Sequence, residues 1–251
     1  MVENQITPFL QRLPKQLNKR QRIILEAIDI SAESIELSMH RIQQLSLDVV
    51  GRDGDPNFSA TERSMLFLDA WGIVDRAHNI RTLLKCGQPS IAVGEGITFD
   101  TEASKGSLMR NAMDHLADNM GNIVEKDRSP PIYGIITFVW AAQPNCRAMV
   151  SVSGSGFHHA FGWAVTEEIA KPMMSAECED FILCAFNLTL DLSSLTNLTK
   201  ARRAALNAAV EEQCRKVSLE RATPDGLSVE ELMEPIVGGT TLIVRWTREK
   251  A

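Results

Sequence analysis

The sequence lacks an apolar run of the roughly 18 residues that a membrane-spanning helix requires. Even the segment IYGIITFVWAA is interrupted at Gln143. The first twenty residues, which include two prolines and several charges, also lack an apolar stretch of signal-peptide length. Both absences favour a cytoplasmic protein that is neither exported nor embedded in a membrane.

Cysteine is sparse, and no two cysteines have the CxxC spacing typical of metal-binding motifs. The five cysteines are scattered along the chain at Cys86, Cys146, Cys178, Cys184 and Cys214. An odd, dispersed set argues against a disulfide framework and against a structural zinc site. We therefore expect no metal and no cofactor, and a reducing cytoplasm suits these thiols.

The chain also lacks an excess of positive charge. Its formal net charge of -6 disfavours a general nucleic-acid coat protein, because non-specific phosphate binding depends on a strongly basic surface. One local cluster places four basic residues within the eight positions 15–22, which we interpret as the solvated first turns of a helix. With 44% apolar and 23% charged residues, the composition is that of an ordinary globular protein.

The N-terminal half is predicted to be helical. Apolar residues recur at helical intervals over residues 15–50, which indicates one long helix or two. Ser59 is a plausible N-cap for a helix that ends at Cys86, residues 88–99 are expected to form a loop, and residues 108–124 are again helical. Short connections between such helices favour an antiparallel bundle.

The segment 126–131, which ends in Pro130-Pro131, breaks helical structure and is the best boundary in the sequence. Strands are expected at 132–142, 147–153, 161–166, 181–192 and 240–247, with a helix at 198–219. The predicted class is α+β, with a helical bundle over 1–128 and a mostly antiparallel sheet with helical cover over 132–251. The role of the second domain is open, and binding of a protein partner is one possibility.

The helix at 108–124 carries the most specific candidate site. Its apolar residues gather on one face, and Arg110 and His115 flank the opposite polar face, about 140° apart around the helix axis. Asn111 lies one turn before His115 and is placed to orient the imidazole. Asp114 and Asp118 share the polar face and would repel a phosphate. Ordinary solvated side chains are the structural alternative.

The string Arg110-Asn111-Ala-Met-Asp-His115 resembles the signature of the HEPN superfamily of helical bundles, over roughly residues 59–125. The resemblance implies metal-independent cleavage of RNA by attack of the ribose 2′-hydroxyl. His115 would transfer protons, and Arg110 would stabilise the phosphorane charge. Because the two side chains diverge on one helix, a working site requires a homodimer. HEPN domains also include inactive forms, so a non-catalytic dimeric interaction or regulatory module, or a nucleotide-binding module, is the alternative.

A second candidate group comprises Asp75, His78 and Arg81 on the helix at 59–86. His78 and Arg81 fall within its broad apolar half, where buried polar groups need partners. The structural interpretation is a hydrogen-bonded histidine and an arginine that reaches solvent. In the functional interpretation, Asp75 orients His78 and Arg81 lines the same cleft as Arg110.

Overall fold

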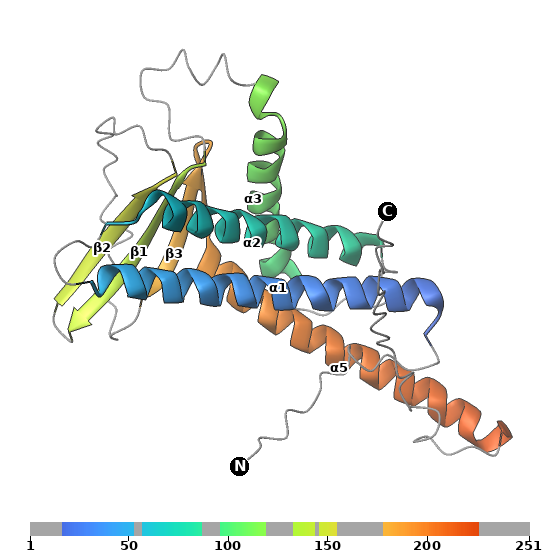
Figure 1. Cartoon of the computed structure of the whole chain (residues 1–251). Helices are drawn as coiled ribbons and strands as arrows, with labels where there is room; N and C mark the ends of the chain where they lie inside the picture. The colour runs from blue at the N-terminus through green and yellow to red at the C-terminus, as the bar shows by residue number, and fades with distance from the viewer. Residues whose placement is uncertain are drawn as a thin grey trace, which may run out of the picture.

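The computed structural model describes residues 17–52, 57–86, 96–118, 133–143, 146–154 and 178–225 (Figure 1). Three helices come first: α1 (Lys19–Val50), α2 (Ala60–Cys86) and α3 (Gly96–Asp114). Four strands and a long helix follow: β1 (Ile135–Gln143), β2 (Cys146–Ser153), β3 (Cys178–Ala185), β4 (Leu188–Asp191) and α5 (Leu192–Asp225). This order confirms the α+β class. The strands predicted at 161–166 and 240–247 lie outside the described residues.

Capping boxes fix the starts of α1 and α2. The side chain of Asn18 accepts a hydrogen bond from the Gln21 N–H (3.0 Å), and Gln21 accepts one from the Asn18 N–H (2.9 Å). Ser59 and Glu62 form the same reciprocal pair at 3.2 and 2.8 Å. The predicted N-cap at Ser59 is therefore confirmed. Helix α2 ends at Cys86 as predicted, and α1 is one helix rather than two.

The predicted start of the third helix is wrong. Residues 88–99 were expected to form a loop and 108 to begin the helix, whereas α3 begins at Gly96. The buried side chains of Phe99, Ala103 and Met109 lie on its inner face. Tertiary packing therefore stabilises this helix, although its local helix propensity is weak. Helix α3 itself ends at Asp114, residues 116–118 are again helical, and the end predicted at residue 124 lies outside the described residues.

The sheet has the strand order β2-β1-β3-β4, and every pairing is antiparallel. The single strand predicted at 181–192 is wrong, because β3 and β4 form a hairpin. Its two turn residues, Phe186 and Asn187, have φ angles of 52° and 60°, the positive values that a tight hairpin turn requires. Immediately afterwards, the Asp191 carboxylate accepts the Ser194 N–H (2.8 Å) and caps α5, which is longer than the predicted 198–219.

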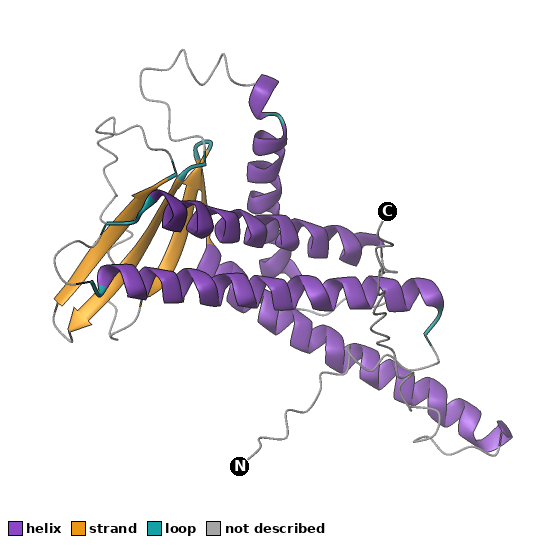
Figure 2. Cartoon of the chain, in the orientation of Figure 1, coloured by secondary structure: helices purple, strands orange, loops and turns teal. Residues whose placement is uncertain are grey.

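One hydrophobic core joins the two halves of the described chain. Buried side chains from α1, α2, β1, β3 and α5 form a single cluster that includes Ile35, Ile73, Phe138, Leu183 and Leu206. In Figure 2 the sheet lies at one end of the helices, where the C-terminal end of α1 and the N-terminal end of α2 cross it. Within the described residues, this cluster therefore includes side chains from both sides of the boundary predicted near residue 130.

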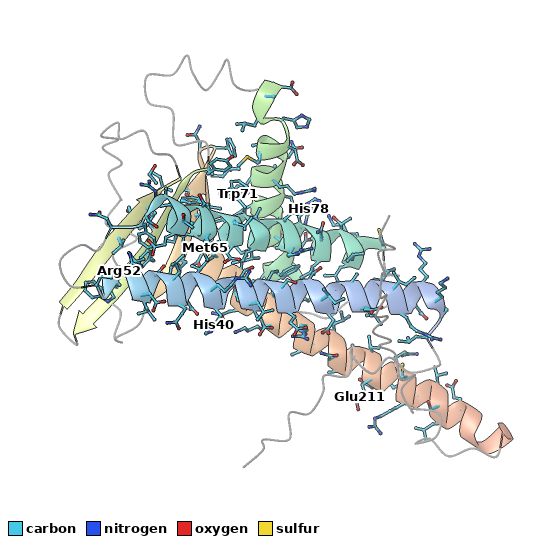
Figure 3. All side chains as sticks on the ribbon, viewed as in Figure 1. His40, Arg52, Met65, Trp71, His78 and Glu211 are labelled. Carbon is cyan, nitrogen blue, oxygen red and sulfur yellow. The ribbon has the colours of Figure 1, made fainter. Side chains whose placement is uncertain are left out.

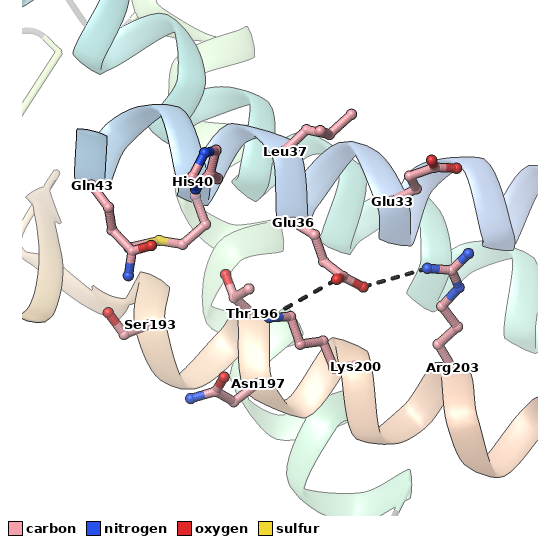
Figure 4. A pocket seen from close by; sticks show the side chains of 11 residues that line it. Glu33, Glu36, Leu37, His40, Gln43, Ser193, Thr196, Asn197, Lys200 and Arg203 are labelled. Carbon is pink, nitrogen blue, oxygen red and sulfur yellow. Dashed lines mark hydrogen bonds and ion pairs between the residues drawn. The ribbon is translucent and has the colours of Figure 1, made fainter. Parts of the chain in front are cut away.

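Helix α5 packs along α1 through a buried ion pair. Nε of Arg203 lies 2.6 Å from Oδ1 of Asp29. Nη1 of Arg203 lies 3.4 Å from Oε1 of Glu36, a contact that Figure 4 marks between α5 and α1. The Arg203 and Asp29 side chains are only 15% and 5% exposed. None of the helices among the described residues is both long enough and apolar enough to cross a membrane.

Candidate functional site

Three polar pairs join α2 to α3 along their line of contact. They are Asp75 with Arg110 (2.6 Å), His78 with Ser107 (2.9 Å) and Arg81 with Asp100 (2.7 Å). The pairing brings the Arg110 of the HEPN-like motif into one row with Asp75, His78 and Arg81. Asp75 contacts Arg110 and His78 contacts Ser107, whereas the sequence suggested that Asp75 would orient His78.

A cleft of about 770 Å³ opens beside this row, between α2, α3 and the residues flanking β1 and β2. Its charged and large aromatic lining residues include Arg63, Trp71, Asp75, Arg110, Asp114 and Tyr133. Trp71 and His78 mark the corresponding stretch of α2 in Figure 3. Of the three motif residues, only Arg110 lines the cleft, and Arg81, expected to line it, does not.

The charges that line the cleft cancel. Its charged lining residues are two arginines, Arg63 and Arg110, and two aspartates, Asp75 and Asp114. The Asp114 carboxylate lies 3.9 Å from Nη2 of Arg110, so it acts by charge and not through a hydrogen bond. The cleft is therefore not an electropositive channel of the kind that binds nucleic acid through phosphates alone.

His115 and Asn111 lie at the exposed end of α3. The His115 N–H donates to the Asn111 carbonyl (3.2 Å), which continues the helical hydrogen bonding one residue beyond the regular helix. Nδ1 of His115 lies 3.5 Å from Oδ2 of Asp118, and both side chains are largely exposed, at 58% and 82%. An accessible imidazole next to a carboxylate is suited to accept or donate protons.

The hydrogen bonds of Ser107 indicate the tautomer of His78. The Ser107 hydroxyl donates to the Ala103 carbonyl (2.9 Å), so it accepts from Nδ1–H of His78. Burial lowers the pKa of His78; the positive charges of Arg110 and Arg81 lower it further, against the opposing effects of Asp75 and Asp114. The lowered pKa favours the neutral imidazole, and in this tautomer Nε2 carries no proton.

The aromatic wall of the cleft was not identified from the sequence. Nε1–H of Trp71 donates to the Tyr133 carbonyl (3.1 Å), and the Trp71 ring packs edge-on against Phe186 at 6.2 Å. Trp71 is half-buried, and Tyr133, the one tyrosine in the sequence, is 50% exposed. Tyr133 lies just after the Pro130-Pro131 break, where the sequence signals a boundary rather than a binding residue.

No protein-family model matches this chain, and it has no significant match among curated proteins or solved structures. Within the described residues, no group of three or more His, Cys, Asp or Glu side chains is arranged to hold a metal ion. The functional interpretation depends on the cleft, the polar row and the motif at 110–115.

Proposed function

We propose that the chain is a cytoplasmic, metal-independent endoribonuclease of HEPN type that acts as a homodimer through Arg110, Asn111 and His115. The supporting observation is that the Arg110 guanidinium lines a cleft of about 770 Å³ on the same helix whose end carries the exposed His115. A cleft of this size falls within the range of small-ligand sites, roughly 300–1,000 Å³, so one nucleotide fits it.

The chemistry matches these two side chains. The ribose 2′-hydroxyl attacks the adjacent phosphorus, the bond to the 5′-oxygen breaks, and a 2′,3′-cyclic phosphate remains. Arg110 uses Nε–H to bind Asp75, and its terminal nitrogens carry four further N–H groups for the phosphorane oxygens. His115 exchanges the proton of the attacking or the leaving oxygen, and Asn111 supports the backbone of that helical turn.

The proposal requires a second copy because His115 lies outside the cleft that Arg110 lines. Exposed apolar side chains on α2 and α3 supply a surface for it: Met65 is 49%, Leu68 is 75% and Leu108 is 59% exposed. Exposed apolar side chains are enriched at association surfaces. Sedimentation at tens of micromolar should show a dimer that Leu68→Asp dissociates; a monomeric wild-type chain would contradict the composite site.

Cleavage without metal is the direct test. Wild-type protein in EDTA should cut single-stranded RNA and leave 2′,3′-cyclic phosphate ends. His115→Ala should slow cleavage by about 10²- to 10⁴-fold, the effect of losing a general acid or base. Arg110→Ala should have a comparable effect through lost charge stabilisation. His40→Ala, on α1, is the matched control; equal rates for His115→Ala and His40→Ala would exclude the motif.

One observation favours a second candidate, a non-catalytic dimeric interaction or regulatory module. Asp75 and Asp114 neutralise Arg110, and much of the cleft wall is apolar. Such a surface suits a protein partner, with the C-terminal part of the chain as a further contact. This candidate predicts no cleavage by the wild type and a change in self-association or partner affinity on Arg110→Ala.

A further inference from the structure

Tyr133 is held at the mouth of the cleft by its main chain while its side chain remains exposed. Its carbonyl accepts Nε1–H of Trp71 (3.1 Å), and the next residue, Gly134, has φ +88° and accepts the Gly154 N–H (2.9 Å). A Cβ on Gly154 would lie 2.7 Å from the Tyr133 Cβ, so only glycine at 154 leaves room for this arrangement. The ring is thus presented to solvent from a fixed backbone.

The charge balance of the cleft indicates which kind of ligand the Tyr133 ring binds. Because Arg63 and Arg110 are offset by Asp75 and Asp114, the net charge of the cleft adds little to phosphate binding, and we expect an uncharged part of the ligand to supply further affinity. A flat nucleobase is uncharged and has a π-face that stacks on an aromatic side chain. Its attached phosphate is then within the same cleft as the guanidinium groups.

We propose that Tyr133 forms a stacking site for one unpaired base of single-stranded nucleic acid, with the flanking phosphate at Arg110. This inference rests on the proposed function, since it names the part of the RNA that the cleft recognises. A base inside a duplex is already stacked on both faces, so the site selects single strands. The apolar cleft wall around Phe67 and Met113 then excludes water from the bound base.

Binding of a 2′-O-methyl oligoribonucleotide tests the inference separately from catalysis, because that ligand lacks the nucleophilic hydroxyl. Fluorescence anisotropy of a labelled eight-nucleotide strand should give saturable binding to the full-length protein. A DNA strand of the same sequence reports whether the 2′-position matters, and a duplex reports whether the base must be unpaired. The single strands should bind at least about tenfold more tightly than the duplex, because stacking is available only to unpaired bases.

Two substitutions at one position decide the role of the ring. Tyr133→Ala should weaken binding by about 5- to 100-fold, the range that stacking contributes per base, whereas Tyr133→Phe should remain within about twofold. Met149→Ala, on β2 and 46% exposed, is the matched surface control. Gly154→Ala should weaken binding as Tyr133→Ala does, because the added methyl displaces Tyr133.

Three results would overturn the stacking site. The first is no binding of the single strand, and the second is a duplex that binds as tightly as the single strand. The third is an equal change in single-strand affinity for Tyr133→Ala and Met149→Ala. Loss of self-association on Tyr133→Ala with unchanged oligonucleotide binding would assign the ring to a protein contact. If RNA is cleaved but Tyr133→Ala does not change binding, the proposed function stands and the stacking site does not. If the oligonucleotide binds through Tyr133 but RNA is not cleaved, the stacking site stands and the proposed ribonuclease function does not.

Discussion

Removing the Arg203 side chain should destabilise the protein by about 3–5 kcal/mol, the cost of leaving a buried charge without its partner. Arg203→Leu removes the ion-pair partner of Asp29, whose side chain is 5% exposed and lies 2.6 Å from Nε of Arg203. Burial alone would lower the pKa of Arg203, but the hydrogen bond to Asp29 and the charges of Asp29, Glu36 and Glu33 outweigh it and raise that pKa. The guanidinium is therefore charged at every pH of interest.

Urea unfolding followed by circular dichroism measures this cost. The double variant Arg203→Leu/Asp29→Leu should recover most of the lost free energy, since apolar residues can replace a buried ion pair at little cost. Arg215→Leu is the matched control on the same helix, where Arg215 is 58% exposed and pairs with Glu211 at 3.0 Å; it should cost under about 1 kcal/mol. Equal losses for Arg203→Leu and Arg215→Leu would refute the close packing of α5 on α1.

Two further predictions concern the α2 helix. Trp71→Ala should cost near the lower end of the roughly 3–5 kcal/mol typical of large aromatic truncations, because Trp71 is half-buried and also loses its hydrogen bond to Tyr133; a loss under about 1 kcal/mol in urea melts would contradict its packing role. Burial lowers the pKa of His78 below its ordinary 6.5, so the unfolded chain binds a proton that the folded chain does not. Stability should therefore fall as the pH drops below about 6.5, and His78→Gln should reduce that fall.

The helices that the sequence predicted well are those with strong local signals. Ser59 and Glu62 stand three residues apart before an apolar run, which is the pattern of a capping box, and the structure contains that box. The start of α3 has no comparable signal. Gly96 and Gly106 lower helix propensity. A Cβ added at residue 106 would lie 3.6 Å from side-chain atoms of Val74 and of Leu190, so this part of α3 packs closely against α2 and β4.

The hairpin between β3 and β4 was missed for a similar reason. Phe186 at a positive φ is unfavourable by local rules, because side chains larger than glycine or asparagine rarely adopt that conformation. Its ring packs against Trp71, more than a hundred positions earlier in the sequence, and this contact offsets the local cost. A prediction from the local sequence pattern does not include Trp71 as a contact of residue 186.

The sequence indicates Arg110 and His115 as candidate site residues but does not predict which side chains they contact. The types and spacing of Arg110 and His115 identified the motif, and the helical wheel placed both away from the core. The contact between Asp75 and Arg110 depends on the register of α2 against α3, which the sequence does not specify. Tyr133 joins the cleft only because the sheet begins beside α2, so no helical pattern identified it.

A complementation assay tests the central claim, a composite ribonuclease site, most directly. Arg110→Ala and His115→Ala are each expected to be inactive on RNA in EDTA, because each homodimer lacks one essential group at both sites. Mixing the two variants in equal amounts and allowing subunits to exchange should restore about a quarter of wild-type activity, since half of the dimers then carry one intact site out of two. A mixture as inactive as its components, or a wild-type protein that leaves RNA uncut, would contradict the account.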